Sequence, residues 1–204
     1  MNKQAIKIKK RTLRIFLVFA VAIVIFLGYF LFNNSSFSVK SGSQSIAGET
    51  LEAKFARLSS ANTNFCAGPD ILDLTDSERL QGSCCSAMDF HRYKEQIEGL
   101  KKYSNIKQIP EDPYDISKKL ADELLDYQKN IQLSPEEQLI YDEAVNLSHE
   151  GGPCCCKCWR WYAFEGLAKY LITEYNFNEE QIAEIWDLED GCGGSGHIEG
   201  MEGH

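Results

Sequence analysis

The chain has 204 residues, of which 44% are hydrophobic and 25% charged, a composition typical of a globular protein. Acidic residues outnumber basic ones by 30 to 21, which gives a formal net charge of −9. Such a chain repels nucleic acid and anionic lipid, so the charge argues against polyanions as partners. The unusual part of the composition is its eight cysteines.

The first 32 residues predict a membrane anchor. Residues 1–14 hold six lysines and arginines and no acidic residue, and residues 15–32 form an uncharged apolar run. An apolar helix of this length crosses a bilayer, and the basic residues before it place the N-terminus in the cytoplasm. The alternative is a cleaved signal peptide, but the run is long for one and no small-residue cleavage site follows it closely. We therefore expect a single-pass cell-membrane protein with an extracytoplasmic domain.

The rest of the chain predicts an all-α domain. Residues 33–58 are polar and aperiodic, which indicates a flexible stalk. Residues 59–190 show helical spacing of apolar residues and no alternating strand pattern, so we expect a compact bundle of about five helices. We expect helices to start at the capping box Thr75–Glu78, at Cys84, between Asp112 and Asp115, at the N-cap Ser134, at Pro153 and at the N-cap Asn178. The helix from Cys84 is expected to reach about Tyr103.

The central feature is a group of four cysteines within five positions, Cys154, Cys155, Cys156 and Cys158. Pro153 before them and the apolar run after them predict that they occupy the first turns of a helix. A helix N-terminus favours anions, so these thiols are expected to ionise readily, and the thiolate is both the nucleophile and the metal ligand. Cys154 and Cys158 would share a face, whereas Cys156 would point to the core as inert packing.

A second group lies in the helix expected from Cys84. Cys84, Met88 and His91 are spaced i, i+4, i+7 and would share one helical face, with Cys85 beside them. Cysteine, methionine and histidine can all bind one thiophilic ion. The alternative is chance spacing of a small hydrophobic residue, a packing methionine and a surface histidine.

The last fourteen residues, 191–204, are rich in glycine and contain Cys192, His197, Met201 and His204. Such a segment is too glycine-rich to fold alone, and its ligand content suggests a mobile arm that captures an ion and passes it to the helical domain. Together with this tail, all four histidines and both internal methionines of the chain lie near a cysteine.

This pooling favours a site for a thiophilic metal ion, copper or zinc, with a small Fe–S cluster as a weaker alternative. The expected function is sequestration, delivery or sensing of the ion; a binding protein is favoured over an enzyme, and the enzyme question stays open. The candidate ligands are Cys84, Cys85, Met88, His91, Cys154, Cys155, Cys158, Cys192 and His197.

Two other interpretations stay open. Eight cysteines outside the cytoplasm can form a disulfide framework, and 105 pairings of them are possible. The protein would then be a disulfide-stapled interaction domain without metal. In that case Cys66 and Cys192 could pair, although Cys66 could also be a further metal ligand. The Cys155-x-x-Cys158 pair also fits a thiol-disulfide oxidoreductase, but the βαβ pattern of the thioredoxin type is missing.

Overall fold

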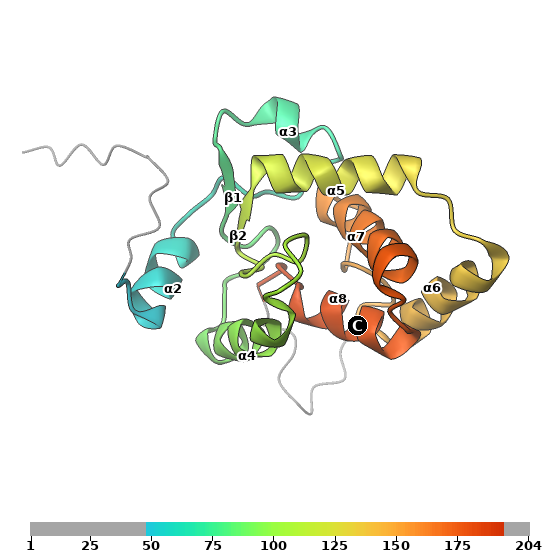
Figure 1. The fold of residues 1–204 in the computed structure, drawn as a ribbon. Helices are drawn as coiled ribbons and strands as arrows, with labels where there is room; N and C mark the ends of the chain where they lie inside the picture. Colours follow the sequence, from blue (N-terminus) through green and yellow to red (C-terminus); the bar gives the residue numbers. More distant parts are fainter. Residues whose placement is uncertain (1–47, 194–204) are drawn as a thin grey trace, which may run out of the picture. The chain divides into compact units, whose positions relative to one another are not determined.

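The computed structural model describes residues 48–193, which form a mostly helical unit of seven α-helices and one two-stranded sheet (Figure 1). The all-α expectation is confirmed at this level. The basic tail 1–14, the apolar run 15–32, residues 33–47 of the expected stalk and residues 194–204 of the glycine-rich tail lie outside the described residues. None of the helices between residues 48 and 193 is long and apolar enough to span a membrane.

The elements follow one another with short connections. In chain order they are α2 (Leu51–Ser59), α3 (Ile71–Leu74), β1 (Arg79–Gln81), α4 (Phe90–Leu100), the 3₁₀ turn η1 (Lys101–Tyr103), β2 (Asp115–Ser117), α5 (Lys118–Asn130), α6 (Pro135–Leu147), α7 (Trp159–Tyr175) and α8 (Glu179–Leu188).

Two helix starts expected from the sequence are confirmed in atomic detail. At α6 the Ser134 hydroxyl accepts the Glu137 N–H, and the Glu137 carboxylate accepts the Ser134 N–H in return. Asn178 and Gln181 make the same reciprocal pair at α8. Each capping box satisfies backbone donors that have no partner inside the helix, which explains why these two starts are readable from sequence.

The small sheet was not expected. Strands β1 and β2 are antiparallel, with Leu80 opposite Ile116, and the two apolar side chains are buried in the core. Each strand has three residues, too few to show an alternating pattern. The expected helix at Thr75–Glu78 is therefore wrong, because this segment leads into β1, and α5 starts at Lys118, later than expected, because residues 115–117 form β2.

The centre of the fold is the crossing of α5 over α7 (Figure 1). Gly166 allows the two helices to approach closely, since a Cβ at this position would lie 2.0 Å from the Leu124 carbonyl oxygen. On the other side of α7, Trp186 of α8 is buried and donates its indole N–H to the Phe164 carbonyl at 3.1 Å. These contacts fix the start of α7, where the cysteines gather.

Helix α2 lies inside the segment expected to be a stalk. Leu58 is fully buried against Tyr93 and Tyr114, and Lys54 makes an ion pair of 2.7 Å with the buried Asp112. The stalk expectation is therefore wrong over residues 51–58, which pack on the domain. The sequence does carry a signal for this helix, because Leu51, Phe55 and Leu58 are spaced i, i+4 and i+7, but the signal covers only nine residues.

Candidate metal centre

Eight cysteine sulfurs meet beside the start of α7. They come from four separate segments: the loop before α3, the loop between β1 and α4, the loop before α7 and the segment after α8. All eight are free thiols. The sulfur–sulfur contacts join Cys66 to Cys156 (3.1 Å), Cys84 to Cys85 (3.5 Å), Cys84 to Cys192 (3.9 Å), Cys154 to Cys158 (3.9 Å), Cys154 to Cys192 (3.4 Å) and Cys155 to Cys192 (3.0 Å).

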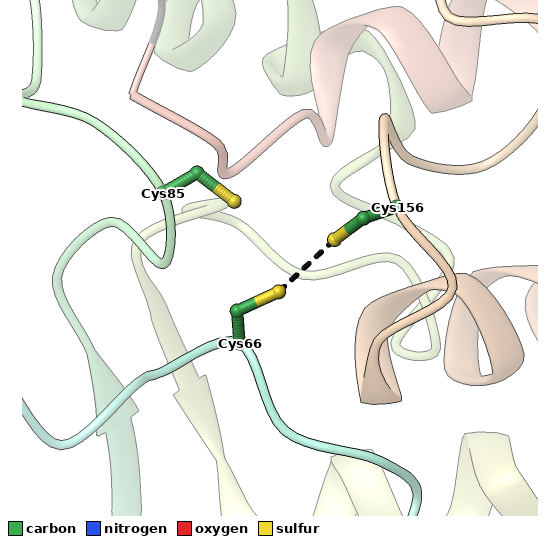
Figure 2. A group of neighbouring side chains, drawn as sticks. All are labelled: Cys66, Cys85 and Cys156. Atoms are coloured by element: carbon green, nitrogen blue, oxygen red, sulfur yellow. Dashed lines mark hydrogen bonds between the residues drawn. The ribbon is translucent and has the colours of Figure 1, made fainter.

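These sulfurs form four groups of three, and within each group all sulfur atoms lie within 4.8 Å of one another. Figure 2 shows the most exposed group, whose three side chains point toward one another from three segments. No histidine or carboxylate of residues 48–193 belongs to any of these groups. The groups are Cys66/Cys85/Cys156, Cys84/Cys85/Cys192, Cys154/Cys155/Cys192 and Cys154/Cys156/Cys158.

The cluster has a buried side and an exposed side. Cys154, Cys158 and Cys192 are 2%, 3% and 8% exposed, and the partly buried Trp161 packs against them. Cys66, Cys85 and Cys155 face solvent. An ion held here would thus be shielded from bulk water on one side and reachable from the other.

Backbone hydrogen bonds tie the Cys84 segment to the Cys192 segment, although the two are 108 residues apart. The N–H groups of Cys84, Ser86 and Asp89 donate to the carbonyls of residues 191, 192 and 193 at 3.2, 2.9 and 2.9 Å. Gly193 has φ +113°, and a Cβ there would lie 2.3 Å from the Ser86 carbonyl oxygen. A glycine is therefore required for this close approach.

The Cys66 segment is tied to α7 through a buried amide. Asn64 donates to the Gly82 carbonyl at 2.8 Å and accepts the Trp159 indole N–H at 3.0 Å. The Trp159 backbone N–H donates to the Ala67 carbonyl at 2.7 Å. Because Asn64 and Trp159 are buried, these bonds hold Cys66 against the loop before α7.

The central cysteines lie before α7 and not in its first turns. Helix α7 begins at Trp159, with Cys158 as its extended N-cap residue. The expected helix start at Pro153 is therefore wrong. A helix would direct successive side chains about 100° apart, whereas the loop turns Cys154, Cys155 and Cys156 toward neighbouring points of one cluster.

The Met88 and His91 expectation depended on a helix that the structure does not form. Helix α4 begins at Phe90, with Asp89 as its N-cap, so Cys84 and Met88 precede it and the three residues share no helical face. Met88 packs beside α2, with its sulfur 3.8 Å from the Ser59 hydroxyl. His91 is 85% exposed and contacts Glu95 at 3.2 Å. Neither residue is brought to the sulfur groups.

The other candidate ligands are six cysteines and His197. The structure brings Cys84, Cys85, Cys154, Cys155, Cys158 and Cys192 together, and His197 lies outside the described residues. It also brings in Cys156, which the sequence assigned to packing, and Cys66, whose role the sequence left open. The sequence signal for Cys66 was its position just before a Gly-Pro pair, which resembles the Gly-Pro before Cys154.

Proton sharing governs the charge of the metal-free cluster. Hydrogen bonds from Cys158, Cys192 and Cys84 lower the pKa of the Cys154 thiol, while the same sharing with Cys154 raises the pKa of Cys84 and of Cys192. Burial raises the pKa of Cys155 to about 12. The first thiolate therefore forms readily, and further thiolates need a cation beside them.

A buried cation of the cluster region is Arg160, which is 1% exposed. Its guanidinium donates to the Glu189 carbonyl at 2.7 Å and lies 5.3 Å and 5.1 Å from the rings of Trp159 and Phe164. Burial lowers the pKa of Arg160, but the negative charges of Cys84 and Cys154 more than offset this, so the pKa is raised and the guanidinium stays charged. Arg160 thus places a permanent positive charge in the field of the thiolates.

Glu189 gives this region a pH dependence of stability. Its carboxyl is 1% exposed with no hydrogen-bond partner for either oxygen, and burial raises its pKa well above the ordinary 4.5, against the opposing effect of Arg160. The folded state therefore holds this proton at pH values where the unfolded state has lost it. Stability from this group is full below the unfolded pKa and is lost as pH rises toward the folded pKa.

We expect a Glu189→Gln variant to lose less stability than the parent as pH rises above about 4.5, because the amide cannot ionise. Urea unfolding of both metal-free proteins at several pH values measures this difference. Parallel curves would show that the pKa of Glu189 is the same in the folded and unfolded states, which would contradict the shift.

Comparison with protein-family models, with curated proteins and with solved structures finds no match for this chain.

Proposed function

We propose that this protein binds thiophilic metal ions in its eight-cysteine cluster, for sequestration or delivery. The observation that carries the proposal is the convergence of all eight sulfurs, from four separate segments, into linked groups of three. Thiolate sulfur selects Cu(I), zinc and iron–sulfur clusters over hard ions such as magnesium or calcium.

The pattern of contacts supports metal binding over a disulfide framework. A disulfide joins each sulfur to one partner, whereas Cys192 contacts three sulfurs, those of Cys84, Cys154 and Cys155. One sulfur with several sulfur neighbours is what shared coordination of ions produces. The same argument weakens an oxidoreductase that uses Cys155 and Cys158, since the sulfur of Cys155 contacts that of Cys192, at 3.0 Å.

The proposal includes attachment to a membrane. Its support is the sequence: six basic residues precede the uncharged run 15–32, which would anchor the domain and place it outside the cytoplasm. No reducing thiol pool protects free cysteines there, so a tightly held ion would protect the cluster from oxidation.

Native mass spectrometry of the full chain, purified in detergent without chelator or reductant, tests the proposal. We expect a mass that contains metal, with the cysteines reduced. A metal-free mass that lacks eight hydrogens, which means that all eight cysteines are oxidised, would overturn the proposal and establish the disulfide framework. A Cys155→Ser variant that abolishes turnover of a dithiol substrate, in a protein without metal, would establish the oxidoreductase instead.

A further inference from the structure

The four groups of three sulfurs close into a ring. Each group shares one cysteine with the next: Cys85, Cys192, Cys154 and Cys156 in turn each belong to two groups. The other four cysteines, Cys66, Cys84, Cys155 and Cys158, each belong to one group. Every group therefore contains one unshared sulfur and two shared ones. This is the connectivity of four metal ions joined by four bridging thiolates, each ion also holding one terminal thiolate.

We propose that the cluster binds four Cu(I) ions, one in each three-sulfur group, with Cys85, Cys154, Cys156 and Cys192 as bridging ligands. This inference rests on the proposed function and specifies its ion and its number. Binding transfers no electrons: each ion arrives as Cu(I), each thiol that becomes a ligand releases its proton to solvent, and copper–sulfur bonds replace S–H bonds.

The number of donors selects the ion. Each group offers three sulfurs, and no histidine or carboxylate in residues 48–193 belongs to a group as a fourth donor. Zinc in structural sites is almost always four-coordinate and tetrahedral, whereas Cu(I) is soft and forms stable planar sites with three thiolates. Three sulfurs around an ion at a bond length of about 2.3 Å lie about 4 Å apart. The observed contacts of 3.4 to 3.9 Å approach this spacing, and the two shorter pairs, at 3.0 and 3.1 Å, would open by about 1 Å.

The charge of the surroundings agrees with monovalent ions. Eight thiolates with four Cu(I) ions leave four negative charges, whereas four zinc ions would leave none. A neutral cluster would not need Arg160, a permanently charged side chain that is fully buried two residues after Cys158. The position of Arg160 is thus explained by an anionic cluster.

The exposed group gives the ions a route inward. Cys66 and Cys85 are exposed, and Cys156 is half-buried. Cys85 and Cys156 also belong to the deeper groups, so an ion bound at the surface already touches two ligands of its neighbours. Exchange between adjacent three-sulfur sites then needs no free ion.

Anaerobic titration of the reduced full chain with Cu(I), in the presence of a competing Cu(I) chelator, tests the proposal together with native mass spectrometry and copper X-ray absorption. We expect four Cu(I) per chain and three sulfur neighbours per ion. The matched variants are Cys66→Ser and Cys156→Ser, whose sulfurs touch at 3.1 Å. Because Cys66 belongs to one group and Cys156 to two, Cys156→Ser should lose at least one more ion than Cys66→Ser.

The outcomes separate the two proposals. A single tightly held ion, or four-coordinate zinc that Cu(I) does not displace, would overturn the four-copper cluster and leave the metal-binding function in place. Equal loss of copper in the two variants would overturn the assignment of bridging ligands. Absence of any bound metal would overturn both the cluster and the function.

Discussion

A Gly193→Ala variant should lose Cu(I) from the two three-sulfur groups that contain Cys192. The added methyl group would lie 2.3 Å from the Ser86 carbonyl oxygen, so the segments that carry Cys84 and Cys192 must separate. Strain at the positive φ and this overlap together cost the folded state about 3 kcal/mol. Anaerobic Cu(I) titration measures the lost ions, and urea unfolding measures the lost stability.

Gly151→Ala is the matched control. Gly151 also has a positive φ, +65°, but a Cβ there would meet nothing within 4 Å. The control therefore carries the backbone strain, about 1 kcal/mol, without moving a cysteine. If the two variants bind the same amount of copper, the contact between the Ser86 and Gly193 segments does not hold the cluster together.

Local signals in the sequence predicted much of the helical framework. The capping boxes at Ser134 and Asn178 act within four residues, so their chemistry is visible without knowledge of the fold. The start of α4 shows the limit of this reasoning. Helical spacing from Cys84 onward was genuine, but the Asp89 side chain caps the helix by accepting the Arg92 N–H at 2.8 Å, and the preceding segment pairs with residues 191–193 instead.

The cysteine cluster could be predicted only in part, because its contacts join distant segments. Sequence placed six of the eight cysteines among the candidate ligands from their clustering and softness, but no local signal brings Cys84 next to Cys192 or Cys66 next to Cys156. Cys156 was assigned to packing because a helix was assumed through the central cysteines. The loop that replaces this helix frees three consecutive residues to point into one site.

Arg160→Met should weaken the metal-free fold and the bound cluster together. The substitution removes the bond from the guanidinium to the Glu189 carbonyl and leaves the negative charge at Cys154 without its buried counter-charge. Removing one partner of a buried charge pair costs about 3 kcal/mol or more. The four negative charges of the copper-loaded cluster would lose the same partner, so we expect Cu(I) affinity to fall about tenfold or more, which corresponds to about 1.4 kcal/mol. Chelator competition measures the affinity, and urea unfolding the stability.

Lys157→Met is the control that separates the loss of a buried charge from the loss of an exposed one. Lys157 lies in the same loop, carries the same charge and is exposed, with its ammonium 5.3 Å from the Trp161 ring. Water screens an exposed charge, so its loss should change stability and copper affinity by less than about 1 kcal/mol. An Arg160→Lys variant keeps the positive charge and should retain most of the Cu(I) affinity, although it loses the guanidinium hydrogen bond to the Glu189 carbonyl. If Arg160→Met and Lys157→Met bind Cu(I) equally well, the buried charge of Arg160 does not stabilise the loaded cluster, and the charge argument for Cu(I) over zinc fails.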